Sequence, residues 1–217
     1  MDVDPASLAA RLVHHQRQRR TVFDWMHPQR LAGVPYAEHA RESGAADTAA
    51  LAEAFLDTIG MRAAPLVTFI APGTELALLP PKECLTVFRL RALLDRVEEV
   101  RAWIDRPRRG LLIEWIGPQG GRLLLGPRRV LGAHAATPVA RRRPLAATDG
   151  DALAWLGFRL FEHECAWAPD GPLAVVQLAM PADAAHDAQQ VFPAGHGGNP
   201  SRVIVAQLPN LFPEGPW

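Results

Sequence analysis

Few residues of this chain could perform chemistry, and they are scattered. His163, Glu164 and Cys165 form the most suggestive group, because a histidine beside a cysteine can support thiol chemistry or bind a metal ion. Consecutive residues of a helix point about 100° apart, however, so these three side chains cannot meet on one ion or one substrate. The same geometry argues against His14 and His15 as a pair. A thiol or metal hydrolase would need further residues from elsewhere in the fold.

The cysteines and histidines follow no metal-binding pattern. The sequence contains neither His-Glu-x-x-His nor Cys-x-x-Cys, and Cys84 and Cys165 fall in different predicted helices. We interpret both cysteines as the reduced thiols of a cytosolic protein. The glycine-rich stretch 195–200 precedes a predicted helix, but it lacks the Lys-Ser/Thr of a phosphate-binding loop. The sequence therefore predicts no catalytic residue, no metal and no cofactor, and hence no enzyme.

Charge is distributed unevenly along the chain. Between Arg106 and Arg143 the only acidic residue is Glu114, whereas acidic residues dominate from Asp149 to Trp217. A chain polarised in this way can present a basic and an acidic surface to different partners, although solvated faces that neutralise one another are the alternative. The candidate partner-binding residues are Arg106, Arg108, Arg109, Arg128, Arg129, Arg141, Arg142 and Arg143.

A second hypothesis uses the same segment differently. The arginines from Arg106 to Arg143 could bind RNA or another acidic ligand in a helical domain. Aromatic side chains that stack on bases are expected between the basic residues of such a site. Trp103 and Trp115 lie in apolar rows typical of a core instead. Protein partners are therefore favoured over nucleic acid.

Length and composition are those of a globular protein. The chain has 217 residues, of which 48% are hydrophobic and 21% charged, and its formal net charge is zero. One domain over residues 1–217 is expected, with two closely packed subdomains as the alternative. We expect no secretory signal peptide and no membrane-spanning segment, because no apolar run approaches the roughly 18–20 residues that a span requires. The expected class is a soluble, cytoplasmic protein.

Two segments carry the strongest helical patterns. From Pro80 to Ile104, apolar residues recur on one face, Arg91 and Asp95 form an i,i+4 pair, and Arg96 falls on the opposite, polar face. From Asp149 to about Trp167 a second amphipathic helix is predicted, with Thr148 and Asp151 as a capping box. Both helices are expected to pack a core and to contain no catalytic group.

The remaining pattern predicts a mainly α-helical, compact and irregular domain with at most a minor β element. Further helices are expected over 5–26, 47–59 and 199–208, with a short polar one over 182–190. Residues 65–79 fit a hairpin or a helix entry, and the valines of 172–180 favour a strand slightly over a helix. We interpret 110–125 as a helical hairpin with a turn at 117–121, and about 127–147 as an exposed connector rich in Arg and Pro.

The succession of these segments resembles the SctK family of type III secretion systems, which includes the YscK, PscK, MxiK, OrgA and Hrp-type proteins. The segments that carry the resemblance are Trp25–Pro28, Leu76–Pro81, Arg89–Leu94, Leu111–Ile116, Ala152–Phe158 and Leu173–Pro181. Each is an apolar helical pattern, so the resemblance depends on their order and spacing over about three-fifths of the chain. The arginine-rich connector has no counterpart in that pattern.

The resemblance implies a non-enzymatic adaptor of the sorting platform. Members of the family link the cytoplasmic forkhead-associated-like domain of the inner-membrane ring protein SctD to the pod protein SctQ, which leads through SctL to the ATPase SctN. The expected location is the cytoplasm, at the cytoplasmic face of the inner membrane when assembled, with membrane contact only through partners. The family provides no catalytic residues to assign to this sequence, and no nucleic-acid partner is expected.

Overall fold

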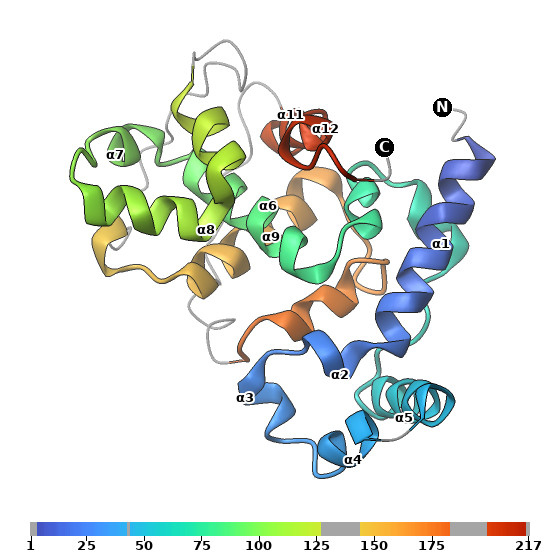
Figure 1. The fold of residues 1–217 in the computed structure, drawn as a ribbon. Coiled ribbons are helices and arrows are strands. Elements are labelled where there is room, and N and C mark those ends of the chain that lie inside the picture. The colour runs from blue at the N-terminus through green and yellow to red at the C-terminus, as the bar shows by residue number, and fades with distance from the viewer. Residues whose placement is uncertain (1–3, 43, 127–143, 183–198, 216–217) are drawn as a thin grey trace. The chain divides into compact units, whose positions relative to one another are not determined.

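The computed structural model describes residues 4–42, 44–126, 144–182 and 199–215, and every regular element in these ranges is helical. Figure 1 shows the helices in chain order. The predicted mainly α fold is confirmed, and the described residues contain no strand. None of the described helices is long and apolar enough to cross a membrane.

The chain divides into two compact units. Unit 1 comprises Met1–Cys84 with Ala166–Asp183, and unit 2 comprises Leu85–Cys165 with Ala184–Trp217. The first boundary falls inside helix α6 (Pro81–Leu94), and the second falls at the end of helix α9 (Gly150–Cys165). That the two units make one domain stays a prediction.

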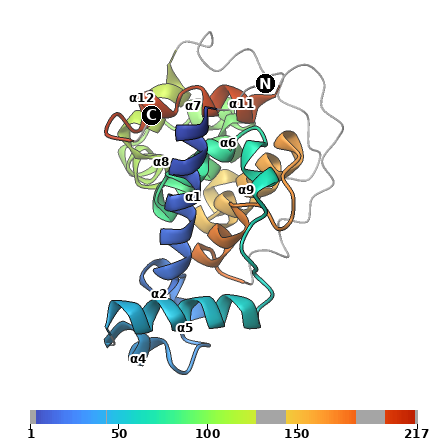
Figure 2. The ribbon, with the colours of Figure 1, turned by 90° about the vertical axis from the view of Figure 1, so that its right-hand side faces the viewer.

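Unit 1 begins with helix α1 (Pro5–Arg20), followed by the short helices α2 (Val22–Trp25), α3 (Pro28–Leu31) and α4 (Ala37–Glu42). The carboxylate of Asp4 accepts hydrogen bonds from the first free amides of α1, as a capping residue should. Helix α5 (Ala45–Thr58) ends where Gly60 adopts a positive φ of 76°. Figure 2 shows α5 lying across the C-terminal end of α1, which it contacts.

The other elements described in unit 1 are three short 3-10 helices, where a hairpin or a strand was considered from the sequence. Residues 65–79 form no hairpin: they form the pair η1 (Leu66–Ile70) and η2 (Thr74–Leu78), separated by Gly73 at φ 83°, and they lead into the helix that begins at Pro81. Residues 172–180 form η4 (Ala174–Ala179) instead of the favoured strand. Val175, Val176 and Leu178 of η4 are all buried, so the segment lacks the alternation of a half-buried strand. Valine content alone therefore could not distinguish a strand from a 3-10 helix.

The longest predicted helix of the central segment is broken. Helix α6 ends at Leu94, and α7 (Val97–Arg101) begins after Arg96, whose φ of −122° is not helical. Arg96 was expected on the polar face but is buried, and two of its guanidinium N–H groups donate to Glu99 at 3.0 and 2.7 Å. Ile104 was expected in the core but is 88% exposed. The predicted Arg91–Asp95 pair is present at 2.9 Å.

Helix α8 (Arg106–Leu125) bends sharply at Gly117, where φ is 68° and ψ is 169°, and resumes at Pro118. The break is therefore one residue rather than the five-residue turn predicted over 117–121. Gly120 and Gly121 are helical and buried. A Cβ on either would meet the side chain of Ile116 or Ile113 at about 3 Å, so these glycines make room for the isoleucines of the preceding limb.

Helix α9 packs on α6 through aromatic side chains and one very close backbone approach. The Phe88 ring lies 5.4 Å from that of Phe158 and 5.8 Å from that of Phe161, measured between centroids. A Cβ on Gly157 would lie 1.8 Å from the carbonyl oxygen of Phe88, so only glycine fits there. The cap of α9 is Asp149, whose Oδ1 accepts the amide of Ala152, and not the predicted Thr148–Asp151 box.

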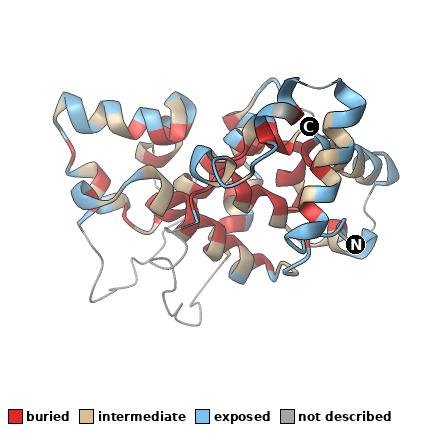
Figure 3. Cartoon of the chain, turned by 90° about the horizontal axis from the view of Figure 1, so that it is seen from below, coloured by how far each residue is buried: buried red, intermediate tan, exposed pale blue. Residues whose placement is uncertain are grey.

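The other elements described in unit 2 are short helices. These are η3 (Leu145–Ala147), α11 (Pro200–Val205) and α12 (Leu208–Leu211), and Asn199 caps α11 by accepting the amide of Arg202 at 3.0 Å. At the end of the expected connector Leu145 is fully buried, whereas Pro144, Ala146 and Ala147 are exposed as predicted. Residues 127–143, and nearly all of the polar helix predicted over 182–190, lie outside the described ranges. Figure 3 shows buried and exposed residues alternating around the helices.

Candidate functional site

His163, Glu164 and Cys165 stand at the C-terminal end of α9 and do not form a site. His163 is exposed, Cys165 is buried, and the carboxylate of Glu164 points to Arg91 of α6. Arg91 donates from Nε to Oε2 of Glu164 at 3.0 Å and from Nη2 to Oε1, so the contact is bidentate. The three side chains diverge, as the helical geometry predicts, and Glu164 has a structural partner.

Glu164 also fastens the C-terminal helix α11. Its Oε2 accepts the backbone amide of Ser201 at 3.1 Å, and its carbonyl oxygen accepts the side-chain amide of Asn199 at 2.5 Å. Burial alone would raise the pKa of Glu164, but the hydrogen bonds and charge of Arg91 and the amide of Ser201 lower the pKa below its usual value. The ionised carboxylate of Glu164 therefore links α9 to α6 and α11, all in unit 2.

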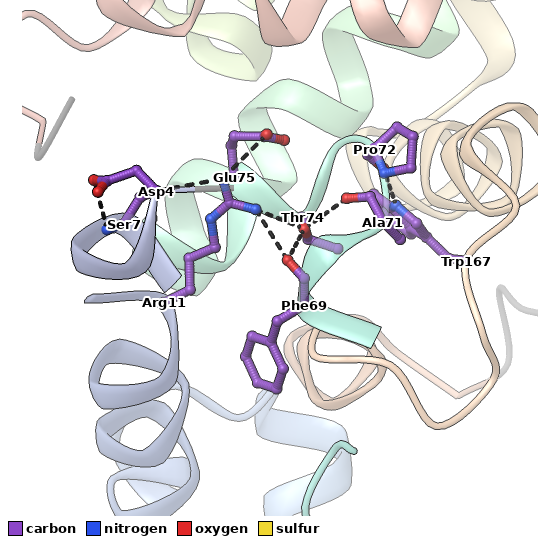
Figure 4. Close-up of polar contacts among 9 residues, drawn as sticks. All are labelled: Asp4, Ser7, Arg11, Phe69, Ala71, Pro72, Thr74, Glu75 and Trp167. Atoms are coloured by element: carbon purple, nitrogen blue, oxygen red, sulfur yellow. Dashed lines mark hydrogen bonds and ion pairs between the residues drawn. The ribbon is translucent and has the colours of Figure 1, made fainter. Parts of the chain in front are cut away.

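A second polar cluster lies between α1 and the pair η1 and η2 (Figure 4). Arg11 is 6% exposed, and its Nη1 donates to the carbonyl of Phe69 at 3.0 Å and to the hydroxyl of Thr74 at 2.9 Å. Its Nη2 donates to Oε1 of Glu75 at 3.2 Å. Arg11 thus donates hydrogen bonds to acceptors of the irregular segment η1–η2, which regular secondary structure does not satisfy. The role of this arginine is therefore structural.

About two turns further along α1, Arg19 also donates hydrogen bonds to irregular backbone. It is 2% exposed, forms a bidentate contact with Glu53 of α5, and donates from Nη1 to the carbonyls of Met61 and Arg62 at 2.8 and 3.0 Å. Gln18 beside it donates to the carbonyl of Leu79 at 2.6 Å. These contacts orient the segment after α5, and they give the buried Arg19 guanidinium a structural role.

His15 lies on the same buried face of α1. Its ring is 5% exposed and packs edge-on against Phe69, with 5.3 Å between ring centroids. Burial and the charge of Arg19 lower the pKa of His15 to about 4, although the nearby carbonyl of Pro172 opposes the shift. Neither ring nitrogen makes a hydrogen bond of normal geometry. The imidazole is therefore neutral near pH 7 and behaves as a core residue.

The two cysteines are free, as predicted, and both are buried. The thiol of Cys84 donates to the carbonyl of Leu76 with an S–O distance of 3.2 Å, and burial raises the pKa of Cys84 far above its usual value. Such a thiol stays protonated and is a poor nucleophile. No group of three or more His, Cys, Asp or Glu side chains able to hold a metal ion occurs in the part of the chain that the structure describes.

The structure places three of the eight predicted partner-binding arginines, and all three lie in the first turn of α8. Arg106 and Arg108 are exposed and Arg109 is half-buried. Arg108 contacts the capping residue Asp105, with 3.4 Å between Nε and Oδ2, whereas Arg106 and Arg109 form no ion pair with any described residue. The other five lie outside the described ranges: Arg128, Arg129, Arg141, Arg142 and Arg143.

Two exposed apolar residues lie beside these arginines and were not predicted from the sequence. Ile104 is 88% exposed and Ile113 is 43% exposed, and Gly110 lies between them with open space where a side chain would be. We define the α8 surface as Ile104, Arg106, Arg109, Gly110 and Ile113. Trp103 and Trp115 are nearby in sequence but are buried against each other, with ring centroids 6.0 Å apart. The signal that could have located Ile104 is its position between the end of α7 and the helix cap Asp105.

Unit 1 has exposed apolar residues of its own on η1. Leu66, Val67 and Ile70 are 57%, 68% and 46% exposed, and Ile59 at the end of α5 is 44% exposed. Large apolar side chains that gather on a surface are typical of contact sites between proteins. The sequence places them in an apolar run that reads as core, so their exposure was not predicted.

The comparisons with known proteins give the family. The model of a family described as bacterial type III secretion protein (HrpB4) matches residues 4–214, which is nearly the whole chain. This chain belongs to that family of type III secretion proteins. The membership is consistent with the Hrp-type resemblance inferred from the sequence. The search of curated proteins and the search of solved structures returned no match.

Proposed function

We propose that this protein is a non-enzymatic adaptor of the type III secretion sorting platform, linking the cytoplasmic domain of SctD to SctQ. The match to a type III secretion family over residues 4–214 is the observation that carries the proposal. The adaptor role, the two partners and a location at the cytoplasmic face of the inner membrane come from the resemblance to the SctK family. SctL and SctN would be reached indirectly, through SctQ.

The described residues support a role in binding rather than in turnover. The titratable side chains that are buried serve the fold: Arg11 and Arg19 hold irregular backbone, and Glu164 ties α11 to α6 and α9. His15 and Cys84 are buried in their neutral forms. Exposed large apolar residues occur in both units, on η1 and on the α8 surface. An adaptor with two protein partners needs at least two such surfaces.

The test is direct binding of purified proteins. The full-length chain is mixed separately with the SctD cytoplasmic domain and with SctQ from the same operon, and each mixture is analysed by size-exclusion chromatography and isothermal titration calorimetry. We expect a stable complex with each partner. If the folded chain bound neither partner at micromolar concentrations, the proposed function would be wrong.

A further inference from the structure

The α8 surface combines exposed apolar side chains with two arginines, Arg106 and Arg109, that no carboxylate in the described ranges neutralises. Positions 106, 110 and 113 of a helix lie on one face, and position 109 lies at its edge. Ile104 precedes the cap of the same helix and is the most exposed large apolar residue described. Arg106, Arg109 and Ile113 therefore stand together on α8, next to Ile104.

Other residues at α8 cap the helix or fill the core of unit 2, whereas Arg106, Gly110 and Ile113 are exposed and Arg109 is half-buried. Asp105 caps the helix, Arg108 contacts Asp105, and the core positions are buried: Leu112, Trp115, Ile116 and Leu124. Gly110 has no such explanation, because its Cβ position is open for 4 Å and its φ is not positive. A glycine inside an exposed helix costs about 1 kcal/mol relative to alanine. Gly110 leaves the helix backbone open between Arg106 and Ile113.

We infer that the α8 surface docks an acidic amphipathic segment of a partner protein. Carboxylates of the segment pair with Arg106 and Arg109, and its apolar side chains cover Ile104 and Ile113 while its backbone approaches Gly110. The charge complementarity selects an acidic partner, and the isoleucines require an apolar one. This inference rests on the proposed adaptor function and names the chemistry of one of its two partners.

The residues present favour a protein segment over nucleic acid. Trp103 and Trp115 are buried and cannot stack on bases. A phosphate backbone offers nothing apolar to cover two isoleucines, and the exposed carboxylate of Glu114 at the C-terminal edge of the surface would repel it. A protein segment can accommodate Glu114 by ending its acidic side chains before that edge.

The experiment compares full-length variants in titrations against the SctD cytoplasmic domain and against SctQ at two salt concentrations. One variant reverses charge, Arg106→Glu with Arg109→Glu, and a second removes apolar area, Ile104→Ser. The matched controls lie on α1: Arg17→Glu with Arg20→Glu, which are exposed arginines, and Val13→Ser, which replaces an apolar residue that is 71% exposed. Circular dichroism verifies that each variant is folded. Binding of single-stranded RNA to the wild type and to the charge variant is measured in parallel.

We expect the charge variant to weaken the binding of one partner about tenfold or more and to flatten its salt dependence. Ile104→Ser should weaken the same partner with the salt dependence unchanged, and the α1 controls should bind as the wild type does. Wild-type affinity of both α8 variants for both partners, or equal losses in the α1 controls, would overturn the inference and leave the adaptor function standing. RNA binding that only the charge variant loses, with protein binding intact, would overturn it in favour of nucleic acid. A wild type that bound neither partner would overturn the function and the inference together.

Discussion

Gly157 gives the sharpest test of how unit 2 is packed. The residue lies in the middle of α9, and a Cβ added there would lie 1.8 Å from the carbonyl oxygen of Phe88 and 2.4 Å from its carbonyl carbon. Both atoms belong to the backbone of α6, so no side-chain rotation can relieve the clash. The substitution Gly157→Ala must therefore move one helix away from the other.

The change in the free energy of unfolding caused by Gly157→Ala combines a favourable effect on helix formation with an unfavourable effect on packing. Alanine is the better helix former by about 0.8–1 kcal/mol, which favours the variant. Overpacking a core typically costs about 1–3 kcal/mol and more where backbone has to shift. Separating α6 from α9 also loosens the contacts of Phe88 with Phe158 and Phe161. We expect a net loss of about 2–4 kcal/mol, which for a chain of this length lowers Tm by roughly 5–10 °C.

Two further glycines provide matched controls within the same unit. Gly110 has open space at its Cβ position, so Gly110→Ala should stabilise the protein by about 0.5–1 kcal/mol. Gly121→Ala meets only the terminal methyl group of Ile113, at 2.9 Å, and that flexible group can move, so the change should be small. Urea unfolding followed by tryptophan fluorescence measures all three. A Gly157→Ala variant as stable as the wild type would refute the close approach of α6 and α9.

Three other perturbations test the polar contacts and the bend in α8. Glu164→Ala leaves Arg91 buried with only part of its charge compensated, so it should lower the free energy of unfolding by about 3–5 kcal/mol in urea titrations, and a loss below 1 kcal/mol would contradict the tie to α11. His15 binds a proton at about 6.5 when unfolded but only at about 4 when folded, so stability should fall by on the order of 3 kcal/mol as the pH decreases from 7 to 4. His15→Leu should make the profile flatter over that range, and an unchanged slope would count against a buried neutral imidazole. Gly117→Ala forces a side chain onto a φ of 68° and should cost about 1–2 kcal/mol, whereas equal stability would argue against the bend.

Local signals predicted the helices whose ends are set by their own residues. Asp4 with Pro5 begins α1, Gly60 follows the end of α5, and Asn199 begins α11, which agrees with the start expected at 5, the end expected at 59 and the start expected at 199. Capping and backbone conformation are properties of a few consecutive residues, so a sequence pattern can reveal them. The α-helical class and the type III secretion family followed from the same patterns taken in order.

The features that were missed depend on residues distant in sequence. Arg11 and Arg19 are buried because their acceptors come from residues 53–75, which no helical period indicates. The break after α6 contains neither proline nor glycine, and Arg96 is held there by Glu99. The strand favoured over 172–180 failed because a buried apolar run has the same composition in a 3-10 helix.

The candidate site was only partly predictable. Counting arginines located the basic start of α8, but charge alone did not show that Arg108 contacts Asp105 whereas Arg106 and Arg109 are unpaired among the described residues. The exposure of Ile104 and of the apolar residues of η1 depends on how each helix packs. From the sequence alone, apolar residues at these positions are expected in the core.

The adaptor role is tested most directly by a bridging measurement. The SctD cytoplasmic domain is immobilised on a biosensor surface, and SctQ is passed over it with and without the full-length chain. We expect SctQ to be retained only when the chain is present, in proportion to the amount of chain bound. Equal retention of SctQ without the chain, or none with it, would contradict an adaptor between these two proteins.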